Sequence, residues 1–282
     1  MVAFSIWSIN VYWYGIFYVV SFIVAYFFLK YIANKWIFIK NEKIQNILDK
    51  NIEDLILYSV IWVLIWWRLW QVIIYDFVYY LNNPIEILQF WKWWMSFIWW
   101  MFWVFISMFV FATKNKLKKI DFICLLDLIL IIAPFGIMLW RLWNFLNQEL
   151  YGILVPSSYW GLNDFWINVF KDIHLFHIYN NIDNLLRINT NLLAWFLEWF
   201  VLLVIVWFIF KRFIKNWVFI VWYITWIFLS WYSFIRFLLE YFRLDSQSEF
   251  VFYLTKSQWF FVFFFVLWLL FLFSKNKQIK LR

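Results

Sequence analysis

The stretch that decides the fold is residues 120–146, IDFICLLDLILIIAPFGIMLWRLWNFL. It is apolar over a length that suffices to cross the hydrocarbon core of a bilayer, which takes about 20 helical residues. Its last turns carry Arg141 and Asn144. Ionisable residues are rare inside membrane spans and usually functional there. The stretch therefore predicts a membrane helix that ends in a polar site.

The rest of the chain repeats this apolar character. Of its 282 residues 67% are hydrophobic, whereas soluble domains have roughly 45–50% by the usual count. This excess excludes a soluble protein. We expect an all-α integral membrane protein, a polytopic bundle of about seven transmembrane helices. The expected spans are 12–33, 54–81, 94–113, 120–146, 191–210, 217–241 and 250–274.

The cations predict the orientation of the bundle. Of the 24 Lys and Arg residues, 16 fall in the loops on one side, within 30–50, 114–119, 211–215 and 275–282. Cytoplasmic loops carry such an excess, so the N-terminus is expected outside and the C-terminus in the cytoplasm. The loop 147–190 then forms a small extracytoplasmic head on a single membrane domain, 1–282. The net charge of +8 comes mostly from these loop cations, which we interpret as topology signals that face anionic lipid. We therefore expect no nucleic-acid partner.

Two further expectations concern processing and cofactors. No cationic region precedes the first apolar stretch, so no cleavable signal peptide is expected. The single cysteine, Cys124, lies in an apolar run and is expected to be buried. One cysteine excludes an intramolecular disulfide and a Cys-cluster metal site. We expect no metal and no cofactor.

A second polar group lies in the span 217–241. Arg236, Glu240 and Arg243 are spaced i, i+4, i+7, which places them on one helix face. Arginine favours bidentate contacts with phosphate, so these residues with Arg141 suggest a pocket for an anionic lipid headgroup. The alternatives are structural ion pairs such as Arg236–Glu240, or side chains that reach to the interface. A transporter is a further class, although paired broken helices are not visible.

Residues 140–152, WRLWNFLNQELYG, resemble the signature G-R-x-G-N-F-(I/L)-N-x-E-x-x-G of the prolipoprotein diacylglyceryl transferase family, with Trp at two glycine positions. Four more segments resemble family motifs in the right order. Trp13-Tyr14-Gly15 matches W-Y-G, 66–70 resembles G-G-R-x-G, and 91–100 resembles W-x-G-G-M-S-F-H-G-G. Residues 231–243 resemble G-Y…R-(F/I)…E-(F/Y)-F-R. The loop 153–186 has no recognisable counterpart.

This resemblance implies an activity in the bacterial cytoplasmic (inner) membrane. The family moves the diacylglyceryl group of phosphatidylglycerol to the lipobox cysteine of a prolipoprotein signal peptide and releases glycerol phosphate. The implied catalytic residues are Arg141, Arg236 and Tyr14. The implied substrate-binding residues are Arg141, Asn144, Asn147, Glu149, Gly152, Arg68, Glu240 and Arg243. The nucleophile belongs to the substrate protein, so the chain itself needs no catalytic triad.

One departure from the family pattern leaves the general base open. The family histidine after S-F is Ile98 here, and the only histidines, His174 and His177, lie in the unmatched loop and are expected at the surface. We favour a thiolate stabilised by arginine without a dedicated base. The alternative functions are an inactive family member or another polytopic lipid-binding or transport protein.

The balance of Trp and Gly is anomalous. Trp occurs 26 times and Gly 4 times, where about 20 Gly are typical for this length. We interpret many of these Trp residues as glycines whose UGA codon, which specifies Trp in some genetic codes and Gly in others, was read as Trp. The alternative is a divergent protein truly packed with Trp. The positions where the family has Gly are Trp62, Trp66, Trp67, Trp70, Trp93, Trp94, Trp99, Trp100, Trp103, Trp140, Trp143, Trp199, Trp226 and Trp231.

Overall fold

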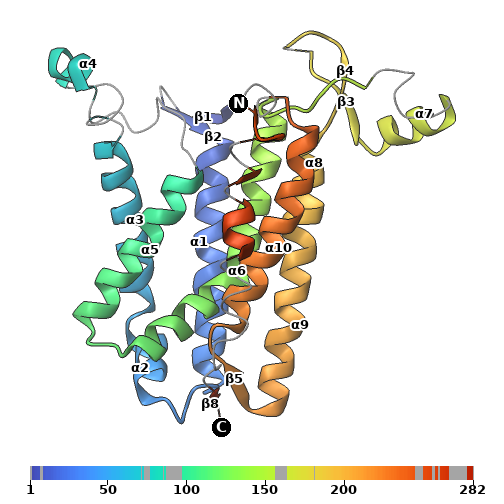
Figure 1. Cartoon of the computed structure of the whole chain (residues 1–282). Helices are drawn as coiled ribbons and strands as arrows, with labels where there is room; N and C mark the ends of the chain where they lie inside the picture. Colours follow the sequence, from blue (N-terminus) through green and yellow to red (C-terminus); the bar gives the residue numbers. More distant parts are fainter. Residues whose placement is uncertain are drawn as a thin grey trace. The chain divides into compact units, whose positions relative to one another are not determined.

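The computed structural model describes residues 2–6, 9–70, 72, 77–84, 86, 97–155, 164–180, 182–244, 250–255, 258–259, 261–266 and 278–281. The chain divides into two compact units. The first consists of Met1–Ala25 and Asp127–Ile279, and the second of Tyr26–Leu126 and Lys280–Arg282. Figure 1 labels their elements.

Helices dominate both units. They are α1 (Trp13–Asn34), α2 (Glu42–Lys50), α3 (Ile52–Trp70), α4 (Phe77–Asn82), α5 (Phe97–Lys114), α6 (Lys119–Leu146), α7 (Asp164–Asp172), α8 (Thr190–Leu193), the π-helical turn η3 (Ala194–Phe200), α9 (Val201–Asn216), α10 (Tyr223–Leu239) and the 3-10 turn η4 (Glu240–Phe242).

The strands are short. Three antiparallel pairs are β1 (Val2–Ile6) with β2 (Ile9–Tyr12), β3 (Phe176–Ile178) with β4 (Leu186–Ile188), and β6 (Phe250–Val251) with β7 (Leu254–Thr255). The remaining strands are β5 (Val218–Ile220) and β8 (Gln278–Lys280).

Within the described ranges, three helices are long and apolar enough to cross a membrane: Gly15–Asn34, Lys119–Leu146 and Thr190–Asn216. Large apolar side chains on them point outward, such as Phe27 (64% exposed) and Phe208 (66%). A bilayer satisfies both observations, because a helix satisfies its own backbone hydrogen bonds and lipid solvates its apolar surface. The expected class, a helical membrane protein, is therefore confirmed at this level.

The observed bounds differ from three expected spans. Residues 54–81 are divided between α3 and α4, and the segment expected to span 250–274 begins with β6 and β7 and continues largely outside the described residues. The span expected from 217 becomes helical only at Tyr223. The reason lies in the turn that precedes it.

That turn is fastened by Asp127, a fully buried carboxylate on α6. Its Oδ2 accepts a hydrogen bond from the Trp222 amide at 2.7 Å, and its Oδ1 accepts from the amide and hydroxyl of Thr225 at 2.8 and 2.5 Å. The first amides of a helix lack partners within the helix. Asp127 supplies acceptors for two of them from another helix, so it determines where α10 begins and ties α10 to α6.

In the second unit, α2 is an amphipathic helix built around a buried glutamine. Asn41 caps its first turn by accepting from the Ile44 amide at 3.3 Å. The Gln45 side chain donates to the Ala33 carbonyl at 3.0 Å and accepts from the Phe38 amide at 3.2 Å. These bonds satisfy the backbone between α1 and α2 where the chain reverses direction.

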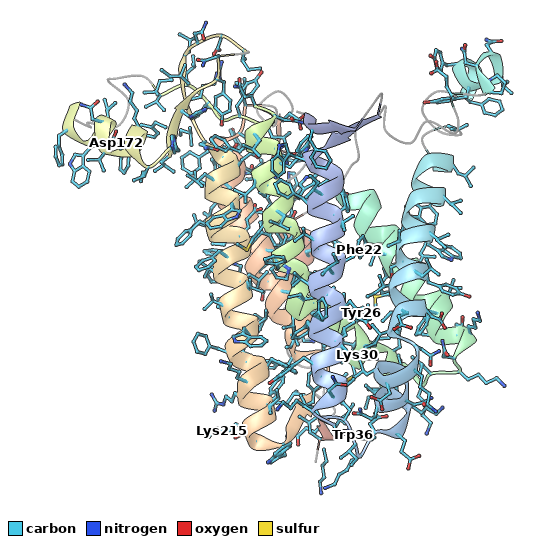
Figure 2. The ribbon with its side chains drawn as sticks, turned by 180° about the vertical axis from the view of Figure 1, so that it is seen from behind. Phe22, Tyr26, Lys30, Trp36, Asp172 and Lys215 are labelled. Carbon is cyan, nitrogen blue, oxygen red and sulfur yellow. The ribbon has the colours of Figure 1, made fainter. Side chains whose placement is uncertain are left out.

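Three tryptophans adopt backbone conformations that favour glycine. Trp36, Trp217 and Trp222 have φ of 51°, 54° and 76°, and Figure 2 labels Trp36 just past the end of α1. A bulky residue at positive φ is a steric outlier, and the left-handed position after a helix is usually Gly. Trp217 occupies that position after α9, its amide donating to Ile214 and Phe213 carbonyls. These three residues are not among the Trp residues listed at family glycine positions. They therefore give separate support to the recoding interpretation, namely that UGA codons for glycine were read as Trp.

We expect Trp217→Gly to raise the free energy of unfolding by about 1 kcal/mol, and with it the unfolding temperature in detergent. The substitution relieves the strain of a left-handed backbone conformation, and the side chain that it removes is 40% exposed. Trp207→Gly in the middle of α9 is the control. It should lower stability, because Gly is unfavourable inside a helix and the ring contacts of Trp207 with Phe210 are lost.

A separate measurement tests whether glycine or tryptophan occupies these positions in the native protein. Mass spectrometry of tryptic peptide 216–236 from the native organism should show glycine at 217 and 222. Tryptophan masses there, or UGG codons, would refute the recoding interpretation.

Candidate functional site

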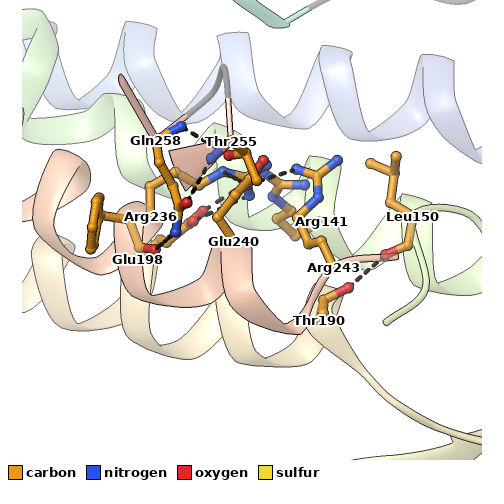
Figure 3. A network of polar contacts seen from close by, with 10 residues as sticks. Arg141, Leu150, Thr190, Glu198, Arg236, Glu240, Arg243, Thr255 and Gln258 are labelled. Carbon is orange, nitrogen blue, oxygen red and sulfur yellow. Dashed lines mark hydrogen bonds and ion pairs between the residues drawn. The ribbon is translucent and has the colours of Figure 1, made fainter. Parts of the chain in front are cut away.

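Five charged side chains converge in the first unit, from three helical segments (Figure 3). Arg141 Nη2 on α6 lies 3.7 Å from Glu198 Oε2, and Arg236 Nη1 on α10 lies 3.3 Å from Glu198 Oε1. Arg236 Nε and Arg243 Nη1 lie 3.5 and 4.0 Å from Glu240 Oε2. The result is an alternating chain of arginine and glutamate, which we call the Arg–Glu chain. Its members are almost completely removed from solvent.

Two buried donors beside this chain are not used. Arg141 Nε and Asn144 Nδ2 are buried and have no hydrogen-bond acceptor among the described residues. They lie i, i+3 on α6, hence on the same face. Buried polar groups are almost always hydrogen-bonded, and each exception asks for an explanation. Glu198 Oε2 and Glu240 Oε2 also have no hydrogen bond among the described residues, but each lies within 4.0 Å of an arginine nitrogen. The two donors on α6 have no acceptor among these residues, and such a pair suits an anion.

The loop after α6 is held against the start of α8. Thr190 Oγ1 donates to the Leu150 carbonyl at 2.6 Å (Figure 3), and Asn191 Nδ2 donates to the Glu149 carbonyl at 2.6 Å. Asn147 Nδ2 donates to Glu149 Oε1 at 2.9 Å. Partial burial raises the pKa of the Glu149 carboxyl, and the Asn147 hydrogen bond opposes this rise.

Gly152 lies in close contact with two backbone segments, β4 and η4. A Cβ there would lie 2.6 Å from the Ile188 carbonyl oxygen and 2.7 Å from that of Phe242. The Gly152 amide donates to Ile188 at 3.0 Å, and Gly152 bridges to Arg243. Only glycine fits this approach, so Gly152 joins the loop to the segment that carries Arg243 by its backbone.

Arg187 contacts three other residues of the region 147–190. Its Nη1 donates to the Gly152 carbonyl at 3.1 Å, its Nε and Nη2 bind Asp183, and its guanidinium lies 5.0 Å above the Tyr151 ring. Hydrogen bonds from Arg187 lower the pKa of the Asp183 carboxyl. Figure 2 marks Asp172 at the end of α7, which belongs to the same region.

A further clamp fastens the segment after β7. The Thr255 amide donates to Gln258 Oε1 at 2.9 Å, and the Gln258 amide donates back to Thr255 Oγ1 at 3.1 Å. Gln258 Nε2 reaches the Phe237 carbonyl on α10 at 3.3 Å. This is a reciprocal capping arrangement, and it lies beside Arg236 and Glu240 in Figure 3.

The structure brings together four of the residues expected at the site, Arg141, Arg236, Glu240 and Arg243. Asn144 lies beside them. Asn147, Glu149 and Gly152 belong instead to the loop contacts. The side chains of Tyr14, Arg68 and Ile98 lie outside the described residues. The Arg236–Glu240 ion pair, considered above as an alternative to a binding site, is also present.

Two simpler expectations have clear outcomes. Cys124 is fully buried, as expected. His174 is exposed, as expected, whereas His177 is half-buried, its ring 5.0 Å from the rings of Phe145 and Tyr179. Burial, followed by the neighbouring His174, lowers the pKa of His177.

The comparison with protein families decides which family the chain belongs to. The model of the family "prolipoprotein diacylglyceryl transferase" matches residues 1–274. The chain belongs to this family. Membership inferred from the motifs is thereby confirmed, and it extends beyond the quoted segments to nearly the whole chain.

Individual members of the prolipoprotein diacylglyceryl transferase family are similar over a shorter stretch. The phosphatidylglycerol–prolipoprotein diacylglyceryl transferase of Rickettsia typhi is 35% identical over 159 residues, 56% of this chain and 57% of that protein. The enzyme of the same name from Rickettsia felis is 36% identical over 158 residues, with the same coverage. The chain thus spans a little over half the length of the curated relatives it matches.

Several residues of the candidate site were not expected from the sequence. Glu198 was not among the expected site residues, although a lone acid in an apolar helix is a usable signal. Thr255 and Gln258 carried the weaker signal of capping-box spacing. Asp127 carried the same signal as Glu198, an acid within an apolar helix. Thr190 and Asn191 carried none, because their partners are backbone carbonyls distant in sequence.

Gly152→Ala should lower the stability of the folded protein by about 2 kcal/mol, because its methyl group would overlap two carbonyl oxygens. The matched control is Gly15→Ala on α1, where an added Cβ meets no atom within 4 Å and helix propensity favours alanine. Thermal unfolding in detergent measures both. An equal response of the two variants would contradict the close approach at Gly152.

Proposed function

We propose that the chain transfers the diacylglyceryl group of phosphatidylglycerol to the lipobox cysteine of a prolipoprotein signal peptide. The observation that carries this proposal concerns two buried donors, Arg141 Nε and Asn144 Nδ2, which have no hydrogen-bond acceptor among the described residues. They lie beside the Arg–Glu chain, which contains three arginines and two glutamates. A phosphodiester supplies the acceptor oxygens and the negative charge that this arrangement lacks. Family membership supplies the reaction class.

The proposed step needs no nucleophile from this chain. The thiolate sulfur of the substrate cysteine attacks the glyceryl CH₂ next to the phosphate. A C–S bond forms, the C–O bond breaks, and glycerol phosphate leaves with the electron pair. The thiol proton ends on the released phosphate or in solvent. The enzyme's tasks are to hold the phosphate in line with the sulfur and to stabilise charge that develops on the leaving oxygen.

The roles follow from position. Arg141 is the first phosphate contact, with Asn144 as a second donor, and Arg236 is held beside Arg141 by their shared partner Glu198. The loop that contains Asn147, Glu149 and Gly152 borders the phosphate site through its links to Arg243 and Asn191. Tyr14 and Arg68 are proposed to contribute from the family motifs they match.

The proposed topology has seven spans, with the N-terminus outside and the C-terminus in the cytoplasm of a bacterial inner membrane. The region 147–190 forms the extracytoplasmic head of the single membrane domain. The outward apolar surface of α1 and α9 and the cation-rich loops support this arrangement. It places the Arg–Glu chain toward the outer leaflet, where a signal peptide presents its cysteine.

A second candidate is a member of the family that binds the lipid headgroup without transfer. Ile98 in place of the family histidine favours it. The transfer assay below separates the two, since binding of the headgroup would persist without product.

In the assay, purified protein, phosphatidylglycerol vesicles and a lipobox peptide are combined, and the mass of the peptide is followed. Arg141→Ala should lower the transfer rate about a thousandfold or beyond detection, as expected when a charged transition-state contact is lost. Arg236→Ala should lower it strongly, and Asn144→Ala about tenfold. Arg212→Ala, at an exposed position of α9, is the control and should retain wild-type rates. Wild-type transfer by folded Arg141→Ala would sink the proposal.

Reporter fusions check the topology. A reporter fused after Arg282 should be active in the cytoplasm, and one inserted within 155–185 should be active outside. The reverse pattern would overturn the orientation and the placement of the site in the outer leaflet.

A further inference from the structure

Glu198 is the acid that joins the two arginines of the site. Its side chain is fully buried, with Oε1 3.3 Å from Arg236 Nη1 and Oε2 3.7 Å from Arg141 Nη2. Arg141 lies on α6 and Arg236 on α10, and Figure 3 shows the carboxylate among their guanidiniums. A buried carboxylate is strongly unfavourable without such partners. The two guanidiniums would likewise repel each other without it.

The backbone at Glu198 is irregular. The helix is an α-helix over Thr190–Leu193 and again over Val201–Asn216, but Ala194–Phe200 forms a π-helical turn. Such turns are rare and occur frequently at functional sites. The irregularity is thus confined to the turn that carries Glu198, and the Glu198 carboxylate connects this turn to Arg236 on α10.

The charges of the chain do not cancel. Three arginines, Arg141, Arg236 and Arg243, face two glutamates, Glu198 and Glu240, which leaves one positive charge. A phosphodiester carries one negative charge, whereas a phosphomonoester carries nearly two at pH 7. In a site removed from water an uncompensated charge is far more unfavourable than in solvent. Among the described residues, the Arg–Glu chain therefore matches the single negative charge of a diester and is mismatched to the two charges of a monoester.

We propose that Glu198 is the positioning residue that sets this match. It holds Arg141 and Arg236 at the spacing for one phosphodiester, and its negative charge disfavours retention of the phosphomonoester product. The inference rests on the proposed function, in which a diester enters and glycerol phosphate leaves. It deepens that function by assigning discrimination between the two to the negative charges of the Arg–Glu chain, and first of all to Glu198, which joins Arg141 and Arg236.

The test compares two soluble probes as competitors. One is the deacylated headgroup glycerophosphoglycerol, a monoanionic diester, and the other is glycerol 1-phosphate, a dianionic monoester. Inhibition constants are measured in the transfer assay, and dissociation constants by calorimetry on the full-length protein. Wild type should favour the diester. Glu198→Gln should strengthen binding of the monoester relative to the diester by about tenfold, as expected for one unit of charge in a partly screened site.

A merely structural role would not produce this ratio. If Glu198→Gln weakens or strengthens both probes equally, the proposal is overturned. Glu240→Gln removes one negative charge from the same chain, so it should shift the ratio in the same direction even if Glu198→Gln does not fold. Absence of a shift in Glu240→Gln, when Glu198→Gln does not fold, also overturns the proposal.

A matched control and a separate readout keep the two proposals apart. Asp172→Asn removes a negative charge from the exposed end of α7 and should leave both constants unchanged. A shift there equal to that of Glu198→Gln would show a general charge effect and contradict the assignment. If wild type transfers no diacylglyceryl group, the proposed function fails, while the calorimetric ratio of the two probes still decides the role of Glu198.

Discussion

The pairing of one buried carboxylate with two guanidiniums organises the first unit. Glu198 has no exposure to solvent, and Arg141 and Arg236 approach it from α6 and α10. In an apolar bundle each of these charges would be unstable alone, so each constrains the position of the others. The π-helical turn at Glu198 and the Asp127 cap at the start of α10 are the backbone features that make this meeting of three segments possible.

The same constraint explains why the Arg–Glu chain has a structural role and is also the candidate binding site. The Arg–Glu chain stabilises the contact of α10 with its neighbours, as the ion-pair interpretation requires. It also retains one excess positive charge and leaves donors on α6 unused among the described residues. A network that served only stability would gain by satisfying those donors. This incomplete satisfaction among the described residues is the observation on which the proposed binding site rests.

At a few positions the backbone geometry indicates whether glycine or a larger residue fits. Gly152 is necessary because two carbonyl oxygens occupy the space of its missing Cβ. Trp217 and Trp222 show the converse, a large residue at a backbone conformation that glycine favours. Trp143 and Trp199, at family glycine positions, are buried near the Arg–Glu chain. The structure therefore bears on the identity of these residues through geometry as well as through family comparison.

The sequence by itself determined the class of fold, the family and the two arginine-bearing segments. Apolar runs of bilayer length can hardly be anything but membrane helices, and the first half of the motif around Arg141, residues 140–146, lies within one helix. The role of Glu198 was decided only by the tertiary structure, since it depends on partners 57 and 38 positions away. The same holds for Asp127, Thr190 and Gly152. Most of their hydrogen-bond partners are backbone carbonyls and amides. Almost every residue carries these groups, so no residue type in the sequence reveals where such bonds will form.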